Sequence, residues 1–276
     1  MLFQRIIRLL TGELSRYGSW AWPDCDNDSF YQNAADRGRY EQEECHIRRH
    51  LAPGQAVEIT GINGSIWADI ASGDNLQVVA VKKSLGGNPA DVVIEVVEHS
   101  GGVTVRAVCP DTGLGVWRGR PERRRRNYNN DVQVDFRVFI PSGARLIARL
   151  LNGQINTLPL QSDINAQIVN GELNISSFRA VEAVTVNGAI VVSVGETDVA
   201  NPIVCRAVNG CITLKLPSQP DAEVQARTLN GNISTDFPLT VQGQFNSNWV
   251  NGMIGSGGRK LTLETNNGSI ELRRTT

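Results

Sequence analysis

The chain has 276 residues, of which 41% are hydrophobic and 20% are charged. This length and apolar fraction allow one large domain or two ordinary ones with a buried core, and they exclude disorder along the whole chain. Lysine plus arginine (27) and aspartate plus glutamate (28) nearly cancel, which excludes nucleic-acid binding driven by overall charge. The five cysteines are odd in number and irregularly spaced, so they do not predict a disulfide framework.

Residues 1–14 predict a short amphipathic helix. Apolar side chains recur at helical spacing, at Phe3, Ile6, Ile7, Leu10 and Leu14. The segment is too short to span a bilayer and lacks a small-residue cleavage site, so we expect neither a transmembrane segment nor a signal peptide. Two interpretations remain open, namely peripheral contact with a membrane and docking on the β domain or on a partner. We favour docking, because two arginines are few for an interfacial anchor.

Residues 15–50 combine aromatic and charged side chains. The aromatic ones are Tyr17, Trp20, Trp22, Phe30 and Tyr31. They fit either a sugar or partner site or a cap on one end of a repeat, and we favour the cap because it needs large apolar area. Cys25, Cys45, His46 and His50 lack the CxxC pairing of a zinc site, so we expect no metal. We therefore divide the chain into a segment of residues 1–50 and a β-repeat domain of residues 51–276.

Five strands are predicted between residues 57 and 140, each from alternation or from a β-branched run. Their sequences are VEITGINGSIWADI, LQVVAVKK, DVVIEVVEH, GVTVRAVC and VQVDFRVFI. Residues 110–130, between the last two, predict a loop that carries Arg123, Arg124, Arg125 and Arg126. A solvated loop is the simpler interpretation, and contact with an anionic surface such as lipid headgroups is the alternative.

An Asn-Gly pair recurs along the chain and is its most informative feature. It occurs at Asn63-Gly64, Asn152-Gly153, Asn170-Gly171, Asn187-Gly188, Asn209-Gly210, Asn230-Gly231, Asn251-Gly252 and Asn267-Gly268. The last seven pairs are 16 to 22 residues apart, a period typical of stacked supersecondary units. An aliphatic residue precedes Asn in every pair but the last, and Ile or Leu always follows three residues after Asn.

This context favours a corner between two strands, because Asn and Gly both tolerate positive φ. In a corner, we expect the aliphatic residue before Asn to point inward and the later Ile to point inward again. Asn side chains of successive coils would then stack in a hydrogen-bonded ladder. The predicted fold is a repetitive all-β solenoid, similar to a parallel β-helix, with a short N-terminal helix. Stacked antiparallel β-hairpins are the alternative.

The open ends of such a stack need charged or irregular residues, because uncovered strands expose unpaired backbone groups. Arg273 and Arg274, after the last motif, fit that role. No G-x-S-x-G, Walker or H-E-x-x-H motif occurs, and the outward repeat positions carry no recurring carboxylate. We therefore expect no enzyme, no catalytic residues and no cofactor.

The repeated V-N-G-x-I units occur together with three further strings that resemble a known family. The strings are V-E-I-T-G-I-N-G-S-I-W-A-D-I, V-V-A-V-K-K and V-F-I-P-S-G-A-R-L. Over residues 55–276 the chain resembles the bacterial "putative adhesin" β-strand-repeat family of unknown function. The resemblance implies a β-solenoid-like domain, usually associated with the cell envelope, with no assigned catalytic residues. Without a signal peptide, the sequence leaves both the envelope and the cytoplasm open as locations.

The leading functional hypothesis is a non-catalytic structural or interaction module that contacts an unknown protein or an envelope component. One alternative is a carbohydrate-binding or polysaccharide-active β-helix that uses the aromatic segment. Another is a scaffold that self-associates through its terminal coils. We expect no nucleic-acid partner.

Overall fold

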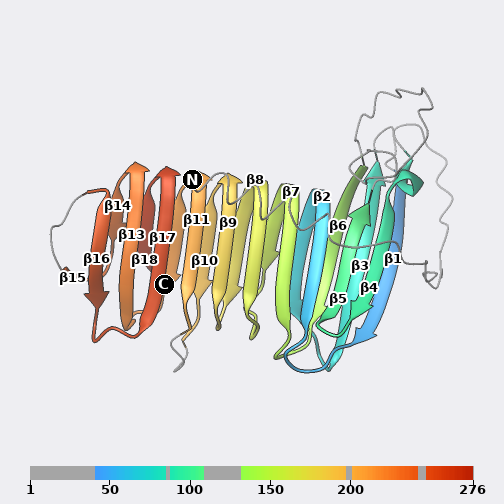
Figure 1. Ribbon diagram of the computed structural model, residues 1–276, viewed down its shortest axis with the longest axis horizontal. Coiled ribbons are helices and arrows are strands. Elements are labelled where there is room, and N and C mark those ends of the chain that lie inside the picture. Colours follow the sequence, from blue (N-terminus) through green and yellow to red (C-terminus); the bar gives the residue numbers. More distant parts are fainter. Residues whose placement is uncertain (1–40, 85–87, 109–131, 197–200, 242–246, 276) are drawn as a thin grey trace.

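The computed structural model describes residues 41–84, 88–108, 132–196, 201–241 and 247–275. Within these ranges the regular structure is β apart from one 3-10 helix, η1 (Pro89–Asp91). The predicted helix at residues 1–14, most of the aromatic segment and residues 123–126 lie outside the described residues. The described chain is an all-β, largely parallel repeat of the β-solenoid type (Figure 1).

Seven coils form the centre of the molecule, and each one contains an Asn-Gly pair. Three of them are single long strands and four are pairs of strands. They are β2 (Ala56–Ile70), β7 (Arg145–Thr157), β8 (Ile164–Ser177), β9 (Val181–Asn187) with β10 (Ile190–Val194), β11 (Ile203–Asn209) with β12 (Ile212–Leu216), β13 (Ala222–Asn230) with β14 (Ile233–Thr235), and β17 (Arg259–Asn267) with β18 (Ile270–Arg274). Neighbouring coils pair in parallel, which differs from a stack of antiparallel hairpins.

The order of the coils in space differs from their order in the chain. The period alone predicts that successive coils are neighbours, and this holds from β7 to β12. The last coil, β17 with β18, then lies between β11/β12 and β13/β14 (Figure 1). The prediction that Arg273 and Arg274 lie at an open end is therefore wrong, because β18 has a parallel neighbour on each side.

The N-terminal end of the stack is covered by strands β1 (Glu41–His50), β3 (Asn75–Ser84), β4 (Val93–His99), β5 (Gly102–Val108) and β6 (Val132–Ile140). Strands β5 and β6 pair in parallel with the first and second halves of β2. Antiparallel β4 pairs with β5, and antiparallel β3 and then β1 follow β6. The chain next returns to β7, which lies on the other side of β2. Strand β1 is rich in charged residues, which discourages further pairing at this edge.

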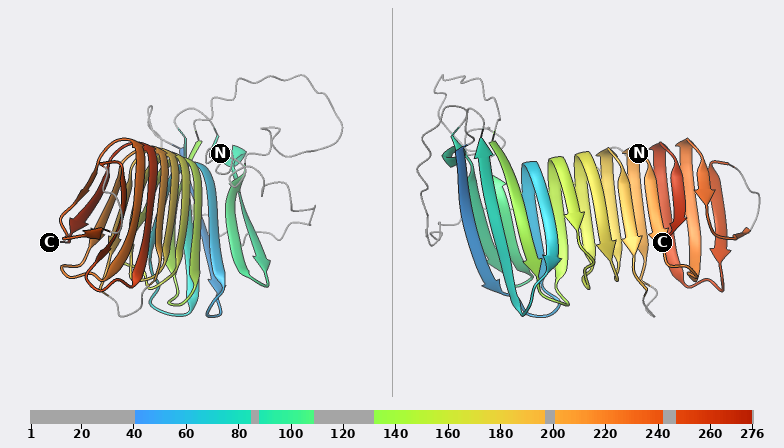
Figure 2. Two further views of the ribbon diagram at one scale, coloured as in Figure 1. Left: turned by 60° about the vertical axis from the view of Figure 1, so that its left-hand side comes forward. Right: turned by 180° about the vertical axis from the view of Figure 1, so that it is seen from behind.

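The C-terminal end is covered by a smaller antiparallel unit. Strand β16 (Trp249–Ile254) pairs with β13, and the short β15 (Thr240–Val241) pairs with β16. Both ends thus share one topology. The chain first forms the outer coil (β2 or β13 with β14), then the antiparallel strands that cover it, and then the coil on its inner side (β7 or β17 with β18). Figure 2 shows the resulting elongated stack from two further sides.

The core is built from columns of side chains that repeat from coil to coil. Residues six positions before Asn are in register from Val57 to Val224, and all of them are buried. Residues three positions after Asn form a second column, in the order Ile66, Ile155, Leu173, Ile190, Ile212, Ile270 and Ile233. Each buried aliphatic side chain contributes about 1.5–3 kcal/mol, so the stack forms its own core.

In the seven coils, the residue directly before Asn points away from the main core, and the prediction that it points inward is wrong there. Val250, before Asn251 in β16, is buried in that core. Leu151 is 44% exposed, whereas Leu150 beside it is 2% exposed. Side chains of a strand alternate between its two faces, and the inward positions here are six, four and two residues before Asn. The residue one before Asn must therefore face out. Val186 and Val208 belong to a small separate cluster on that outer side.

Candidate interaction surface

A ladder of asparagine side chains runs along the corner of the stack. Each amide donates from Nδ2 to Oδ1 of the preceding asparagine at 2.7 or 2.8 Å. The order is Asn63, Asn152, Asn170, Asn187, Asn209, Asn267 and Asn230. The bonds all run in one direction and follow the spatial order of the coils, so they tie all seven coils together at one edge.

Glycine follows asparagine because neighbouring coils approach closely at this position. Gly153 has a φ of 136°, a region that side chains rarely adopt. A Cβ atom there would lie 1.7 Å from the carbonyl oxygen of Gly64, and one at Gly171 would lie 1.8 Å from that of Gly153. Gly210 and Gly231 pack against the next coil in the same way. The backbones of the coils therefore touch along the line of glycines.

Asn251-Gly252 is the motif that stands apart from the ladder. It lies in β16, which is antiparallel to β13, and Asn251 is opposite Gln225 rather than opposite another ladder asparagine. The reversal of chain direction removes this pair from the line of corners. It belongs to the cover of the C-terminal end.

Charged side chains on the outer faces are paired across neighbouring strands. Arg149 pairs with Glu58, and Arg206 lies between Glu182 at 3.3 Å and Glu264 at 3.4 Å. These groups are partly exposed, so each pair adds at most about 1 kcal/mol. Their main effect is to link the outer sides of adjacent coils.

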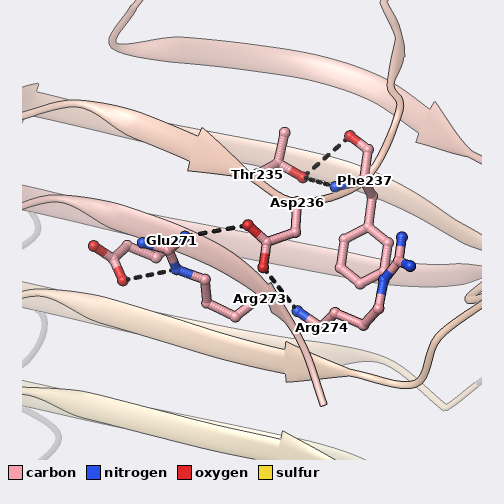
Figure 3. Close-up of polar contacts among 6 residues, drawn as sticks. All are labelled: Thr235, Asp236, Phe237, Glu271, Arg273 and Arg274. Atoms are coloured by element: carbon pink, nitrogen blue, oxygen red, sulfur yellow. Dashed lines mark hydrogen bonds and ion pairs between the residues drawn. The ribbon is translucent and has the colours of Figure 1, made fainter. Parts of the chain in front are cut away.

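A second polar cluster joins the segment after β14 to the last residues of β18 (Figure 3). Asp236 accepts hydrogen bonds from the backbone N–H of Arg274 and from Nη1 of Arg273, both at 3.1 Å. The bond from the Arg274 backbone is the main reason that the pKa of Asp236 lies below its usual value. Arg273 also donates to Glu271, and the guanidinium of Arg274 lies 5.5 Å from the centre of the Phe237 ring. The cluster fixes the segment after β14 against the end of β18.

Asp135 on β6 is held as a carboxylate. Burial alone would raise its pKa, but hydrogen bonds from Lys83, Ser65 and Gln133 together outweigh burial and leave the pKa below its usual value. The Nζ atom of Lys83 lies 2.8 Å from Oδ2, and the Ser65 hydroxyl lies 2.7 Å from Oδ1. Asp135 therefore stays ionised at neutral pH.

The cysteines in the described residues are free thiols. Cys205 is fully buried, and burial raises the pKa of its thiol to about 12. It occupies the inward column between Ala183 and Leu263, where it packs as a small apolar side chain. Cys211 is exposed.

An aromatic hollow lies on the outer face at the N-terminal end of the stack, with a volume of about 840 Å³. Trp67 on β2 is 51% exposed, Phe139 on β6 is 36% exposed and Leu158 after β7 is 52% exposed. Large exposed apolar side chains gathered on one face mark a contact site more often than scattered ones do. We name this feature the Trp67 hollow, and its polar lining includes His46, Asp69, Lys83, Asp135 and Arg137.

Parallel pairing sets the arrangement of these side chains. Trp67 lies between Asn156 of β7 and Arg137 of β6, and Asp69 lies beside Phe139. These residues face outward because they alternate with the inward side chains of Ile66, Ala68, Phe136 and Val138. The strands beneath them are part of the same hydrophobic core as the repeat.

Sequence reasoning did not single out Trp67 or Phe139 as site residues. The available signal was an aromatic residue at an outward position in each of two alternating strands. The two strands become neighbours only through the pairing of β6 with β2. Of the predicted site residues, the asparagines of seven motifs are joined in the ladder, whereas residues 123–126 are outside the described ranges.

Two further features were sought in the part of the chain that the structure describes. No group of three or more His, Cys, Asp or Glu side chains there is arranged to hold a metal ion. No helix within those residues is both long and apolar enough to cross a membrane.

Fold and surface together define a β-solenoid-like protein with an aromatic hollow on one outer face. Residues 151–273, from the corner of β7 into β18, match the Toastrack DUF4097 family. No curated protein matches the chain.

Several solved structures are similar at low identity. A protein named a "putative cell adhesion protein", from Clostridium sporogenes, is 12% identical with a TM-score of 0.45, and the alignment covers 84% of this chain and 100% of that one. A "putative adhesin" from Bacteroides fragilis is 10% identical with a TM-score of 0.26, covering 83% and 97%. Another from Parabacteroides merdae is 10% identical with a TM-score of 0.25, covering 84% and 96%.

Proposed function

We propose that this protein is a non-catalytic interaction module, an adhesin-like β-solenoid that presents an outer face to a component of the bacterial cell envelope. The observation that carries the proposal is the Trp67 hollow, where Trp67 and Phe139 are exposed on strands that the core holds in register and the exposed Leu158 directly follows β7. A rigid sheet face loses little conformational entropy on binding, which favours a role in recognition.

The carboxyl groups with shifted pKa values among the described residues are not suited to general acid catalysis. A carboxyl group that donates a proton near neutral pH needs a raised pKa. The shifted carboxyl pKa values lie instead below the usual range, at Asp135, Asp221 and Asp236. The buried Cys205 thiol, with a pKa of about 12, is equally unsuited to act as a nucleophile.

Self-assembly through the ends is the less favoured alternative. The edge strand β1 carries charged and polar side chains along most of its length, and the C-terminal cover ends in the two-residue strand β15. Short and charged edge strands are features that discourage pairing between molecules.

The test is co-sedimentation of the full chain with bacterial envelope fragments over a range of protein concentrations. We expect saturable retention that falls in a variant carrying Trp67→Ser and Phe139→Ser. The matched control carries Leu151→Ser and Leu229→Ser, two exposed leucines that lie before ladder asparagines, outside the hollow. The control should be retained like the wild type, and circular dichroism should show equal folding of all three proteins.

Two outcomes would contradict the proposal. One is retention that does not saturate or that is equal in both double variants. The other is release of soluble envelope fragments by the wild-type protein at a rate above that of a heat-denatured sample, because a binding module leaves its ligand intact.

A further inference from the structure

We infer that the Trp67 hollow binds an uncharged stretch of polysaccharide, with sugar rings stacked on Trp67 and Phe139. This inference rests on the proposed function, since it names the ligand class for the same surface. It is carried by the spacing of the two aromatic side chains, by the hydrogen-bonding groups around them and by the balance of charge in the lining.

The spacing of the aromatic side chains follows from the register. Trp67 pairs with Arg137, and Phe139 is two residues further along the same neighbouring strand. Strands lie about 4.8 Å apart and rise about 3.3 Å per residue, which puts the two attachment points roughly 8 Å apart. Both side chains leave the same face of a flat parallel pair. One short oligosaccharide laid across the two strands therefore contacts both rings.

A sugar ring matches the chemistry of this face. Its C–H groups form a flat apolar surface that covers an aromatic ring, and its hydroxyl groups form a rim that donates and accepts hydrogen bonds. The rim of the hollow provides both partners. Among the described residues, the guanidinium of Arg137 makes no hydrogen bond or ion pair, and the Asp69 carboxylate accepts one hydrogen bond, from the backbone N–H of Ile70 at 2.7 Å. Arg137 can therefore donate to hydroxyl groups and Asp69 can accept from them.

The charge of the lining favours an uncharged ligand. Lys83 is neutralised by Asp135 at 2.8 Å. The carboxylates of Glu44, Asp69 and Asp135 in the lining outnumber its two cations, Lys83 and Arg137. No excess of positive charge remains to attract an acidic polymer or lipid headgroups. Arg137 and Asp69 lie opposite Trp67 and Phe139 on the paired strands, so charged groups flank both aromatic side chains.

Two amide side chains, Asn156 of β7 and Asn174 of β8, follow Trp67 on the neighbouring coils. Asn156, beside Trp67, accepts a hydrogen bond from Nδ2 of Asn174 on β8 at 3.1 Å. The Nδ2 atom of Asn156 is itself buried and has no acceptor among the described residues. A polymer chain that starts on Trp67 has polar partners in the direction of β8.

The experiment is isothermal titration of the full chain with neutral polysaccharides, namely laminarin, mannan, dextran and a mixed-linkage glucan. Polygalacturonate and anionic phosphatidylglycerol vesicles serve as charged comparators. We expect binding to at least one neutral polymer with little dependence on salt. Trp67→Ser and Phe139→Ser should each weaken it about tenfold or more, because truncation of an aromatic anchor removes most of a local contact. Trp67→Phe should retain part of the affinity, and Leu229→Ser should not change it.

A second measurement is the change in tryptophan fluorescence on binding, which should disappear in Trp67→Phe while binding persists. The inference is overturned if no neutral polymer binds, if the Trp67→Ser and Phe139→Ser variants bind like the wild type, or if only the charged comparators bind. Retention on envelope fragments that still depends on Trp67 and Phe139 would then leave the proposed function standing and remove only the saccharide. Loss of both activities would remove both.

Discussion

The central coils and the N-terminal end of this protein use the same strand geometry for different purposes. From β7 to β12 the coils repeat one pattern, with an aliphatic column inside and an amide ladder at the corner. Beyond β2, at the N-terminal end, this pattern stops, and β4, β3 and β1 pair in antiparallel fashion. Trp67 of β2 and Phe139 of β6 lie on the outer face there. The regular pattern thus occupies the central coils, and departures from it occur where an edge strand needs covering and where we propose that a ligand binds.

The two ends also resemble each other in topology. At each end, one coil pairs with a neighbouring coil that is distant from it in the sequence. Strand β2 lies beside β7 across residues 71–144, and β17 lies between β11 and β13. Each end is therefore fastened to the centre by long-range pairs, which prevents the cover from opening as an independent hairpin.

The largest expected effect is at the glycine line, where the coils touch. Gly153→Ala should destabilise the protein by about 3 kcal/mol or more, because the new Cβ meets the carbonyl of Gly64 and the backbone is at positive φ. Gly73→Ala is the control, since a Cβ there meets no atom within 4 Å. Urea unfolding measures both variants, and equal midpoints would show that close contact between coils is not a requirement.

A next test separates inward from outward positions of the central coils by using two adjacent leucines. Leu150→Ala should cost about 2–5 kcal/mol, the usual range for a buried leucine. Leu151→Ala should cost about 0.5 kcal/mol or less, because its side chain is already in water. Thermal unfolding of the two variants checks this pair. A larger loss of stability for Leu151→Ala than for Leu150→Ala would show that the residue before Asn is the one that points inward.

The amide ladder should contribute less than the core. Asn187→Ala removes one bond to Asn170 and one from Asn209, and we expect a loss of about 1–2 kcal/mol. Asn251→Ala, in the C-terminal cover, makes none of the ladder bonds and should change stability by less than about 0.5 kcal/mol. If chemical denaturation shows equal losses for the two variants, the ladder is not a stabilising feature of the centre.

The smallest effect concerns pH and the N-terminal end. Because the folded pKa of Asp135 lies below its usual value, its contribution to stability is present above about pH 4 and is lost as the pH falls through the folded pKa. Asp135→Asn should therefore flatten the fall in stability below about pH 4. Asp74→Asn, at an exposed turn, is the control. Urea unfolding at a series of pH values checks this, and parallel acid limbs for wild type and Asp135→Asn would contradict it.

Much of the repeat could be predicted from local patterns. The alternation between residues 57 and 140 predicted five strands that coincide with β2 to β6. The Asn-Gly period and the aliphatic residue three positions later predicted coils with a common corner. The candidate surface was not predicted, because Trp67 and Phe139 are 72 residues apart in the sequence and look like ordinary outward positions there.

The sequence by itself determined the all-β class, the corners and the core column that contains Ile155 and Ile190, since each depends on side-chain alternation and glycine chemistry within a few residues. Only the tertiary structure decided that Asn209 pairs with Asn267 rather than with Asn230, that Asn251 leaves the ladder, and that β6 brings Phe139 to Trp67. The reason is that nearly identical motifs offer nearly equal local pairings. The choice among them depends on covering both ends of the stack, which is a property of the whole chain.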